Sequence, residues 1–255
     1  MPIGSRDNSL IKQLRRLAAQ GTAYRKLGQF WIEGDHLCRA ALEHKLTPAV
    51  VVFAESFLPR IPTGWGQLGG KTVVLTDRLF DQISALESAA RVGFVVDLPP
   101  LRVPVVGVAS VVLDRVQDAG NVGSILRSAA AFGFRQVLSL KGSAALWSPK
   151  VLRAGMGAHF SLELVEGLEA LNVMSQGVPL IVTSSHQGEL LQSRSLPWPC
   201  TWAFGHEGQG LDSELLAHAE ISIRIGQPGG EESLNVAAAA AICMHASSIA
   251  RLDRA

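Results

Sequence analysis

The stretch VVGVASVVLDRVQDAGNVGSILRSAAAFGF, residues 105–134, decides the fold class. Its first ten residues form an almost continuous apolar run, which is typical of a parallel strand covered on both faces. A glycine-containing loop follows, and residues 121–134 carry a helical pattern that Gly133 closes. A buried strand that leads through a loop into a helix predicts an α/β domain with a mostly parallel sheet.

The alternation continues to the end of the chain. Buried apolar runs predict further strands at residues 136–140, 179–184, 201–205 and 221–225. Helical spacing predicts helices at residues 148–157, 212–219 and 233–251, the second with Asp212 as its N-cap. We therefore expect residues 105–255 to form one α/β domain.

A smaller α/β unit precedes this domain. Apolar patterning predicts two helices around a strand at 29–34, strands at 48–54 and 72–76, and a helix at 77–86. The stretch DLPPLRVP, residues 97–104, follows this unit, and its tandem prolines disfavour helix on either side. The expected division is residues 1–97, a linker at 98–104, and residues 105–255.

Composition narrows the class of protein only slightly. The chain has 255 residues, is 47% hydrophobic and carries a formal net charge of +1. Residues 1–45 hold eight Lys and Arg against four Asp and Glu, a local excess of four positive charges. This excess fits a nucleic-acid partner, and a solvated helix face explains it equally well.

The cysteines and histidines predict neither a disulfide framework nor a metal site. Cys38, Cys200 and Cys243 are widely spaced and form no CxxC pair, and no histidines have metal-ligand spacing. We expect reduced thiols and a cytoplasmic protein without a metal. The N-terminus resembles no signal peptide, and no apolar run is long enough to span a membrane.

Three strand-to-helix loops are rich in glycine and small polar residues. They cover residues 113–127, 204–211 and 223–236. In a parallel sheet such loops lie together at the carboxyl edge, where ligands bind. The GxGxxG and GxxxxGK[ST] fingerprints of nucleotide-binding proteins are both missing from the sequence. The missing GxGxxG turn disfavours a dinucleotide-dependent oxidoreductase.

These loops carry a resemblance to a known family. Asn121 with Arg127 on one helix, then FGHEGQGL (204–211), then SLNVAAAAA (233–241), resembles the three motifs of the SpoU (TrmH) family of RNA ribose 2′-O-methyltransferases. The resemblance implies a SPOUT fold with a trefoil knot, S-adenosylmethionine as the cofactor and a homodimer. It also implies that the first unit, with the F-x-I-E-G turn near residues 30–34, is an L30e-like domain that holds RNA.

The resemblance assigns catalytic roles to five residues. Arg127 would activate the ribose hydroxyl, or stabilise the alkoxide and grip a phosphate, since guanidinium keeps its proton below about pH 12. Asn121 would orient Arg127 or contact RNA, and the sequence alone favours it as a helix N-cap. Glu207 would support the site loop. Ser233 and Asn235 match the third motif, with Ser233 also a candidate N-cap.

The resemblance further assigns cofactor-contact positions. They are Thr183, Gly205, Glu207, Gly208, Ile225, Ser233, Leu234 and Val236. Ordinary core packing would explain Ile225 and Leu234 as well, and their side chains alone do not decide between the two. Gly226 follows Ile225 where many relatives have proline, which changes the expected loop shape. His206 lies in the second loop and is expected to have no catalytic role.

The implied activity is methylation of a ribose 2′-hydroxyl in structured RNA, with ribosomal RNA as the first choice and transfer RNA as the alternative. A non-catalytic RNA-binding or ribosome-assembly protein that kept the fold remains a second hypothesis. Methylation of a base nitrogen on the same fold is a third.

Overall fold

The computed structural model describes residues 2–174, 176–184, 187–230 and 233–252. The chain divides into two compact units. The first contains residues 1–100 together with 147–160, and the second contains residues 101–146 together with 161–255. No helix among the described residues is long and apolar enough to cross a membrane.

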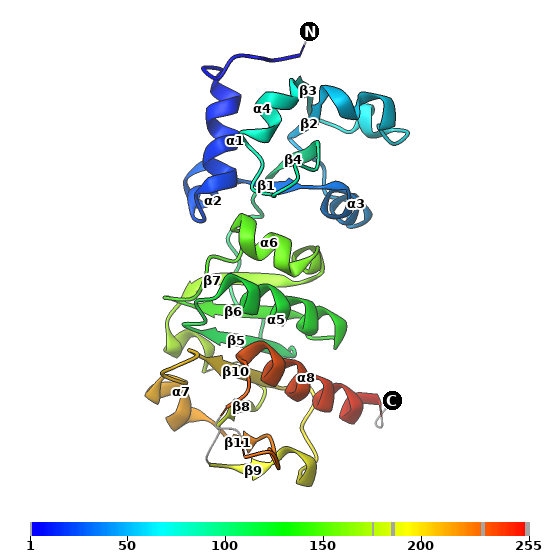
Figure 1. Cartoon of the computed structure of the whole chain (residues 1–255). Helices are drawn as coiled ribbons and strands as arrows, with labels where there is room; N and C mark the ends of the chain where they lie inside the picture. The colour runs from blue at the N-terminus through cyan, green and yellow to red at the C-terminus, as the bar shows by residue number, and fades with distance from the viewer. Residues whose placement is uncertain (1, 175, 185–186, 231–232, 253–255) are drawn as a thin grey trace. The chain divides into compact units, whose positions relative to one another are not determined.

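The N-terminal unit is built from short helices around a four-stranded sheet (Figure 1). Its elements are α1 (Ser9–Ala19), α2 (Ala23–Leu27), β1 (Gln29–Glu33), α3 (Asp35–Glu43), β2 (Val50–Ala54), η1 (Glu55–Arg60), η2 (Trp65–Gln67), β3 (Lys71–Leu75), α4 (Asp77–Asp81), β4 (Val92–Asp97) and α6 (Pro149–Gly155). The strands and helices expected in the first 81 residues are present, with α4 ending five residues earlier than predicted.

The strand β4 was not predicted. It lies between β1 and β2 and pairs antiparallel with both, so the sheet order is β1-β4-β2-β3. Its residues 92–96 are all buried, because both of its edges and both of its faces are covered. Periodicity could not identify it, since the run VGFVV does not alternate and Gly93 interrupts it.

The segment 147–160 groups with the N-terminal unit, although its sequence lies within the expected 105–255 domain. Trp147 packs against Phe30 of β1, with ring centroids 4.6 Å apart. In α6, a Cβ at Gly155 would lie 2.5 Å from the ring of His159. Any larger residue at position 155 would therefore force the His159 ring to move.

The C-terminal unit contains the seven-stranded sheet. Its elements are β5 (Ser110–Asp114), α5 (Ala119–Ala131), β6 (Gln136–Leu140), η3 (Ala158–Ser161, shared with the first unit), β7 (Glu163–Leu168), η4 (Ala170–Val173), β8 (Leu180–Thr183), β9 (Glu189–Leu190), η5 (Leu191–Ser193), β10 (Thr201–Gly205), α7 (Ser213–His218), β11 (Ile221–Arg224) and α8 (Val236–Leu252). The strand order is β7-β6-β5-β10-β8-β11-β9. Every neighbouring pair is parallel, which confirms the predicted sheet.

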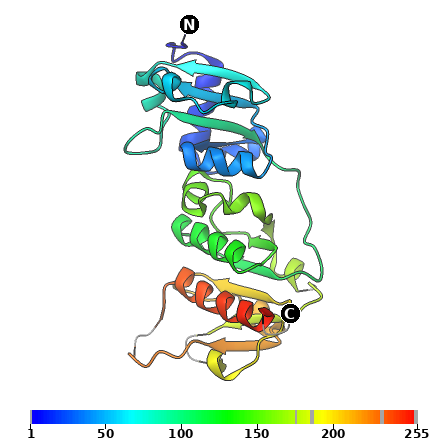
Figure 2. The same ribbon diagram turned by 90° about the vertical axis from the view of Figure 1, so that its right-hand side faces the viewer.

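Helices cover the two faces of this sheet differently. α5 and α8 pack beside each other on one face (Figure 2). Trp202 of β10 points to that face, and its indole nitrogen donates a 2.9 Å hydrogen bond to Ser247 of α8. The neighbouring Ala203 belongs to the opposite face, because successive strand residues alternate.

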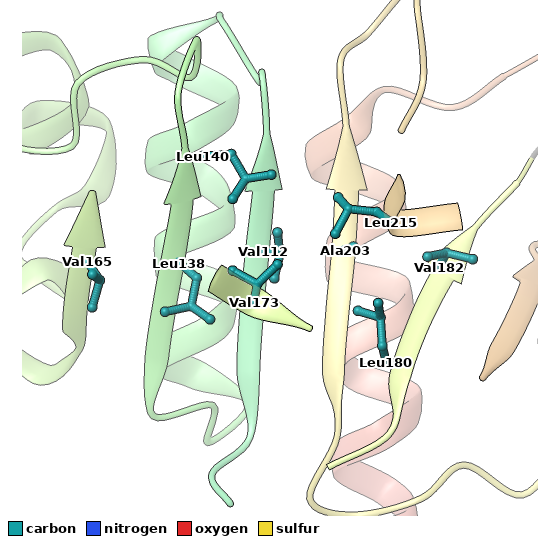
Figure 3. Close-up of a cluster of buried hydrophobic side chains, with 9 residues drawn as sticks. All are labelled: Val112, Leu138, Leu140, Val165, Val173, Leu180, Val182, Ala203 and Leu215. Atoms are coloured by element: carbon teal, nitrogen blue, oxygen red, sulfur yellow. The ribbon is translucent and has the colours of Figure 1, made fainter. Parts of the chain in front are cut away.

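The opposite face carries the apolar cluster of Figure 3. Leu138 and Leu140 of β6, Ala203 of β10 and Val182 of β8 form its sheet side. Val173 of the short helix η4 and Leu215 of α7 pack against this side of the sheet and complete the cluster. The cluster extends over several neighbouring strands of this face. It stabilises β5, β10 and β8 in the register that brings their carboxyl ends together.

Gly93 provides a test of the N-terminal core. A Cβ at Gly93 would lie 2.2 Å from Cη2 of Trp31 and 2.7 Å from the carbonyl oxygen of Ile32, so Gly93→Ala forces a buried ring to move. We expect this variant to lose about 1–3 kcal/mol of unfolding free energy in urea titrations. Gly66→Ala is the control, because nothing lies within 4 Å of its Cβ position. Equal stability of the two variants would contradict this packing.

Candidate active site

The three glycine-rich loops meet at the carboxyl edge of the parallel sheet. Two of them, residues 204–211 and 223–236, line a cavity of about 340 Å³ between the ends of β8, β10 and β11 and the start of α8. Its lining consists of Thr183, Ser184, Phe204, Gly205, His206, Glu207, Gly210, Leu211, Ile225, Gln227, Ser233, Leu234, Asn235, Val236 and Ala239. Seven of the eight predicted cofactor-contact residues are in this list, and the exception is Gly208.

A chain of side-chain hydrogen bonds joins the three loops. Asn235 donates from Nδ2 to Oδ1 of Asn121 at 3.0 Å. Asn121 in turn donates from its own Nδ2 to Oε1 of Glu207 at 3.1 Å. The three residues come from the loops after β11, β5 and β10. The structure therefore brings together three of the five predicted catalytic residues, and Ser233 and Asn235 both line the cavity.

The helix caps differ from the sequence prediction. Asp118 is the N-cap of α5, and its side chain accepts from the backbone N–H of Asn121 at 2.8 Å. The Asn121 side chain is thus available for the contacts with Glu207 and Asn235. At α8, Asn235 rather than Ser233 accepts from the N–H groups of Ala237 and Ala238. One amide therefore both caps α8 and donates to Asn121.

Glu207 is held in its ionised form. Partial burial by itself would raise the pKa of Glu207, but the Asn121 amide and backbone N–H groups at Glu207, Asp118 and Gln117 donate to its carboxylate. These hydrogen bonds outweigh burial, so the pKa of Glu207 lies below its ordinary value. A carboxylate in this state accepts hydrogen bonds and is a poor general acid at neutral pH.

The loop after β10 is a tight turn closed by its own backbone. His206 and Gly210 exchange two backbone hydrogen bonds, of 3.1 and 2.9 Å. A Cβ at Gly205 would lie 2.4 Å from the carbonyl carbon of Gly210, so only glycine permits the approach. Nδ1 of His206 accepts from the N–H of Gly208 and Gln209, which gives this ring a structural role inside the turn.

Arg115 also contacts this turn, and no pattern in the sequence predicted that contact. Its guanidinium contacts both oxygens of Asp114 at 2.7 and 2.9 Å, and it also reaches Oε1 of Gln209 at 3.2 Å and the carbonyl oxygen of Gly210 at 3.4 Å. Asp114 is buried and accepts from the N–H of Asp212 as well. No short motif signals these long-range contacts. Only its place directly after a buried strand could have suggested a role.

Arg127 stands apart from this network. It is exposed on α5, it is not in the cavity lining, and it forms no hydrogen bond or ion pair within the described part of the chain. It follows Asn121 by six residues, which places it about 120° around the helix. The amide of Asn121 contacts Glu207 and Asn235, and its expected role in orienting Arg127 stays a prediction.

The cavity wall combines apolar and polar groups. Leu234 is 38% exposed, while Phe204 is buried. Oε1 of Gln227 is buried and has no hydrogen-bond partner among the residues the structure describes. A buried acceptor left without a donor costs about 1–3 kcal/mol. A ligand with N–H or O–H groups at this wall would remove that cost.

Thiol and metal chemistry find no support at this site. The three cysteines are buried, and burial raises the pKa of Cys200 and Cys243 to about 12. Such thiols are poor nucleophiles. Within the part of the chain that the structure describes, no three His, Cys, Asp or Glu side chains are grouped to hold a metal ion.

Comparison with known proteins identifies the family. The sequence matches the SpoU rRNA Methylase family over residues 109–245, which is more than half of the chain. The chain belongs to the SpoU rRNA methylase family. The resemblance found in the three loops is thereby confirmed, and so is the α/β fold class with its parallel sheet.

Full-length relatives share both units of this SpoU chain. The Bacillus subtilis 23S rRNA (guanosine(2553)-2′-O)-methyltransferase RlmP is 29% identical over 95% of this chain and 97% of its own length. A TrmH-family structure from Porphyromonas gingivalis has 32% identity and a TM-score of 0.82, covering 93% of this chain and 96% of its own. AviRb from Streptomyces viridochromogenes, solved with AdoMet, is 23% identical with a TM-score of 0.83, over 96% of this chain and 98% of its own, and shares the fold.

The role of Arg115 can be tested by hydrogen exchange. Its φ of 55° is strained for arginine, so Arg115→Gly relaxes the backbone while it removes every guanidinium contact. We expect amides of residues 206–211 to exchange about tenfold faster, as loss of roughly 1.4 kcal/mol of local stability predicts. Arg91→Gly is the control, since Arg91 also has a positive φ but lies in the N-terminal unit. Unchanged exchange in Arg115→Gly would refute the contact's role.

Proposed function

We propose that this chain transfers the methyl group of S-adenosylmethionine to a ribose 2′-hydroxyl in structured RNA, with ribosomal RNA as the substrate. The observation that carries the proposal is the Asn235–Asn121–Glu207 hydrogen-bond chain at the rim of the 340 Å³ cavity. Family membership and the named activity of the Bacillus subtilis relative support it. A non-catalytic RNA-binding protein would not need this network beside an open cavity.

The residues present fit the cofactor. S-adenosylmethionine, when bound, supplies an electrophilic methyl group on a sulfonium. In the cavity, Ile225, Leu234 and Val236 provide apolar surface for an adenine ring. Gln227 offers the unpartnered acceptor Oε1 to an amino or hydroxyl group. Thr183, Gly205 and Ser233 add polar backbone and hydroxyl groups to the same cavity, and Gly208 donates its backbone N–H to Nδ1 of His206 within the turn.

We assign to Arg127 the stabilisation of the ribose oxygen. A guanidinium stays charged at neutral pH, so it acts by lowering the energy of a developing alkoxide rather than by taking the proton. Its exposed position leaves its donors available for RNA phosphate as well. The ionised Glu207 and the Asn121 amide hold the loops in place around this reaction.

Several further features belong to this proposal. We infer that the chain works as a homodimer in the cytoplasm and that the site lies near the subunit interface. The position of Arg127 outside the cavity lining supports a site completed by a second protomer. We also infer that the C-terminal unit has the trefoil knot of SPOUT proteins, and that the N-terminal unit is L30e-like and holds the RNA.

The deciding experiment maps ribose methylation in ribosomal and transfer RNA from a deletion strain. The proposal expects one 2′-O-methyl group to disappear from ribosomal RNA and to return when purified protein and S-adenosylmethionine are added. Nucleoside mass spectrometry of the restored product separates ribose methylation from base methylation. A loss confined to transfer RNA would change the substrate, and no loss together with no cofactor binding in calorimetry would refute the enzyme.

Arg127→Ala should lower methyl transfer at least a hundredfold, because removing a charged donor at a developing oxyanion costs about that much. Cofactor affinity measured by calorimetry should stay within about twofold, since Arg127 does not line the cavity. Arg135→Ala, which removes another exposed arginine from the same unit, is the matched control and should retain activity. Full activity of Arg127→Ala would overturn the assignment.

Asn235 allows capping and site chemistry to be separated. Asn235→Asp keeps an oxygen that caps α8 but loses the Nδ2 donor to Asn121. We expect nearly unchanged melting and at least tenfold slower methyl transfer. Asn235→Ala should lose both, with about 1 kcal/mol less stability from the missing cap. If Asn235→Asp were fully active, the hydrogen-bond chain would be structural only.

A further inference from the structure

The F-x-I-E-G turn builds a second cavity, in the N-terminal unit, that the methyl-transfer site does not use. This cavity has a volume of about 180 Å³ and lies between the end of β1, the start of α3, the loop before β4 and helix α6. Its lining is Trp31, Glu33, Gly34, His36, Leu37, Ala85, Leu86, Pro149, Leu152, Arg153 and Met156. We call it the turn pocket.

An aromatic wall of the turn pocket is fixed in place. Trp31 is 3% exposed, and its six-membered ring lies flush against Gly93, where no side chain would fit. The indole Nε1 is buried and has no hydrogen-bond partner among the described residues. The apolar face of the indole, rather than this buried N–H, is what Trp31 contributes to the wall.

The loop wall is also ordered in advance. Oε1 of Glu33 accepts from the Ser84 hydroxyl at 2.5 Å and from the N–H of Ala90 at 3.4 Å, and Oε2 accepts from the N–H of Ala85 at 3.4 Å. Arg153 of α6 donates to the carbonyl oxygen of Ala85 at 3.1 Å. Glu33 is therefore occupied with loop donors, and the turn pocket is formed before any ligand arrives.

The mouth of the turn pocket is apolar and basic. Met156 is 41% exposed, and it is held there by a left-handed backbone with a φ of 49°, which is unusual for methionine. Lys150 and Arg153 are exposed and lie three residues apart on α6, so their side chains share one side of the helix. Met156 follows directly after the end of α6. Positive charge beside an exposed thioether suits a ligand with a flat apolar body and a nearby phosphate.

We propose that the turn pocket receives one unpaired base of the substrate RNA, an inference that rests on the proposed function. Sequence-specific RNA recognition targets unstacked bases, which stack on aromatic or apolar side chains and offer acceptors along their edges. Trp31, Leu37 and Met156 supply the apolar slot in which the base stacks. Lys150 and Arg153 hold the flanking phosphates.

The test compares two kinds of RNA probe on the full-length protein. One is a 20-base-pair duplex, and the other is the same duplex with a single bulged nucleotide, made in four versions with each base. We expect at least one bulged probe to bind about five- to tenfold more tightly than the plain duplex, as one stacked base contributes. Equal affinity for all five probes would overturn the proposal.

Two variants locate the effect in the turn pocket. Ala85→Phe fills the mouth from an exposed position and keeps the backbone contacts of Ala85, so it should abolish the preference for the bulge. Met156→Gly suits the positive φ and should reduce the preference about threefold. Ala19→Phe, at an exposed position outside the turn pocket, is the control and should bind like the unchanged protein.

Calorimetry with S-adenosylmethionine distinguishes the two possible failures. Normal cofactor binding with an unchanged bulge preference in Ala85→Phe would refute the turn pocket alone. If the protein without any substitution does not bind S-adenosylmethionine, the proposed function is refuted instead. A change of oligomeric state in Ala85→Phe, seen by size-exclusion chromatography, would make the turn pocket a contact between copies of the chain and would also overturn the inference.

Discussion

The site depends on one amide, the side chain of Asn121. It accepts from Asn235 and donates to Glu207, so it needs both an acceptor and a donor at the same place. These partners are 114 and 86 residues away along the chain. The two bonds can form only after β5, β10 and β11 have assembled in one sheet. An aspartate at 121 could accept but not donate, and it would repel the ionised Glu207.

Two side chains near Asn121 also make two kinds of contact each. Asn235 caps α8 while it donates to Asn121, and Asp114 orients Arg115 while it accepts from the N–H of Asp212. Each residue thus couples local chain geometry to a contact between loops. The φ of Arg115, 55°, is unfavourable for this residue. The contacts of its guanidinium with Gln209 and Gly210 offset that strain.

The sequence predicted what local pattern determines. The strands at 136–140 and 201–205 have the predicted bounds, and the strand-end rule brought seven of eight expected positions to one cavity. The sequence pattern did not predict β4 or β7, because the placement of these strands depends on their neighbours in the sheet rather than on alternation of apolar and polar residues. The caps Asp118 and Asn235 were missed because a side chain with two possible partners is decided by tertiary contacts.

The segment 147–160 shows why a linear division of this chain is insufficient. It leaves the C-terminal unit after β6, packs Trp147 against Phe30 and supplies Arg153 and Met156 to the turn pocket, and then returns to β7. The unit proposed to hold RNA is therefore completed by residues from the middle of the methyltransferase sequence. The chain crosses between the two units near residues 100, 146 and 160, so three stretches of chain connect them rather than the proline-rich linker alone.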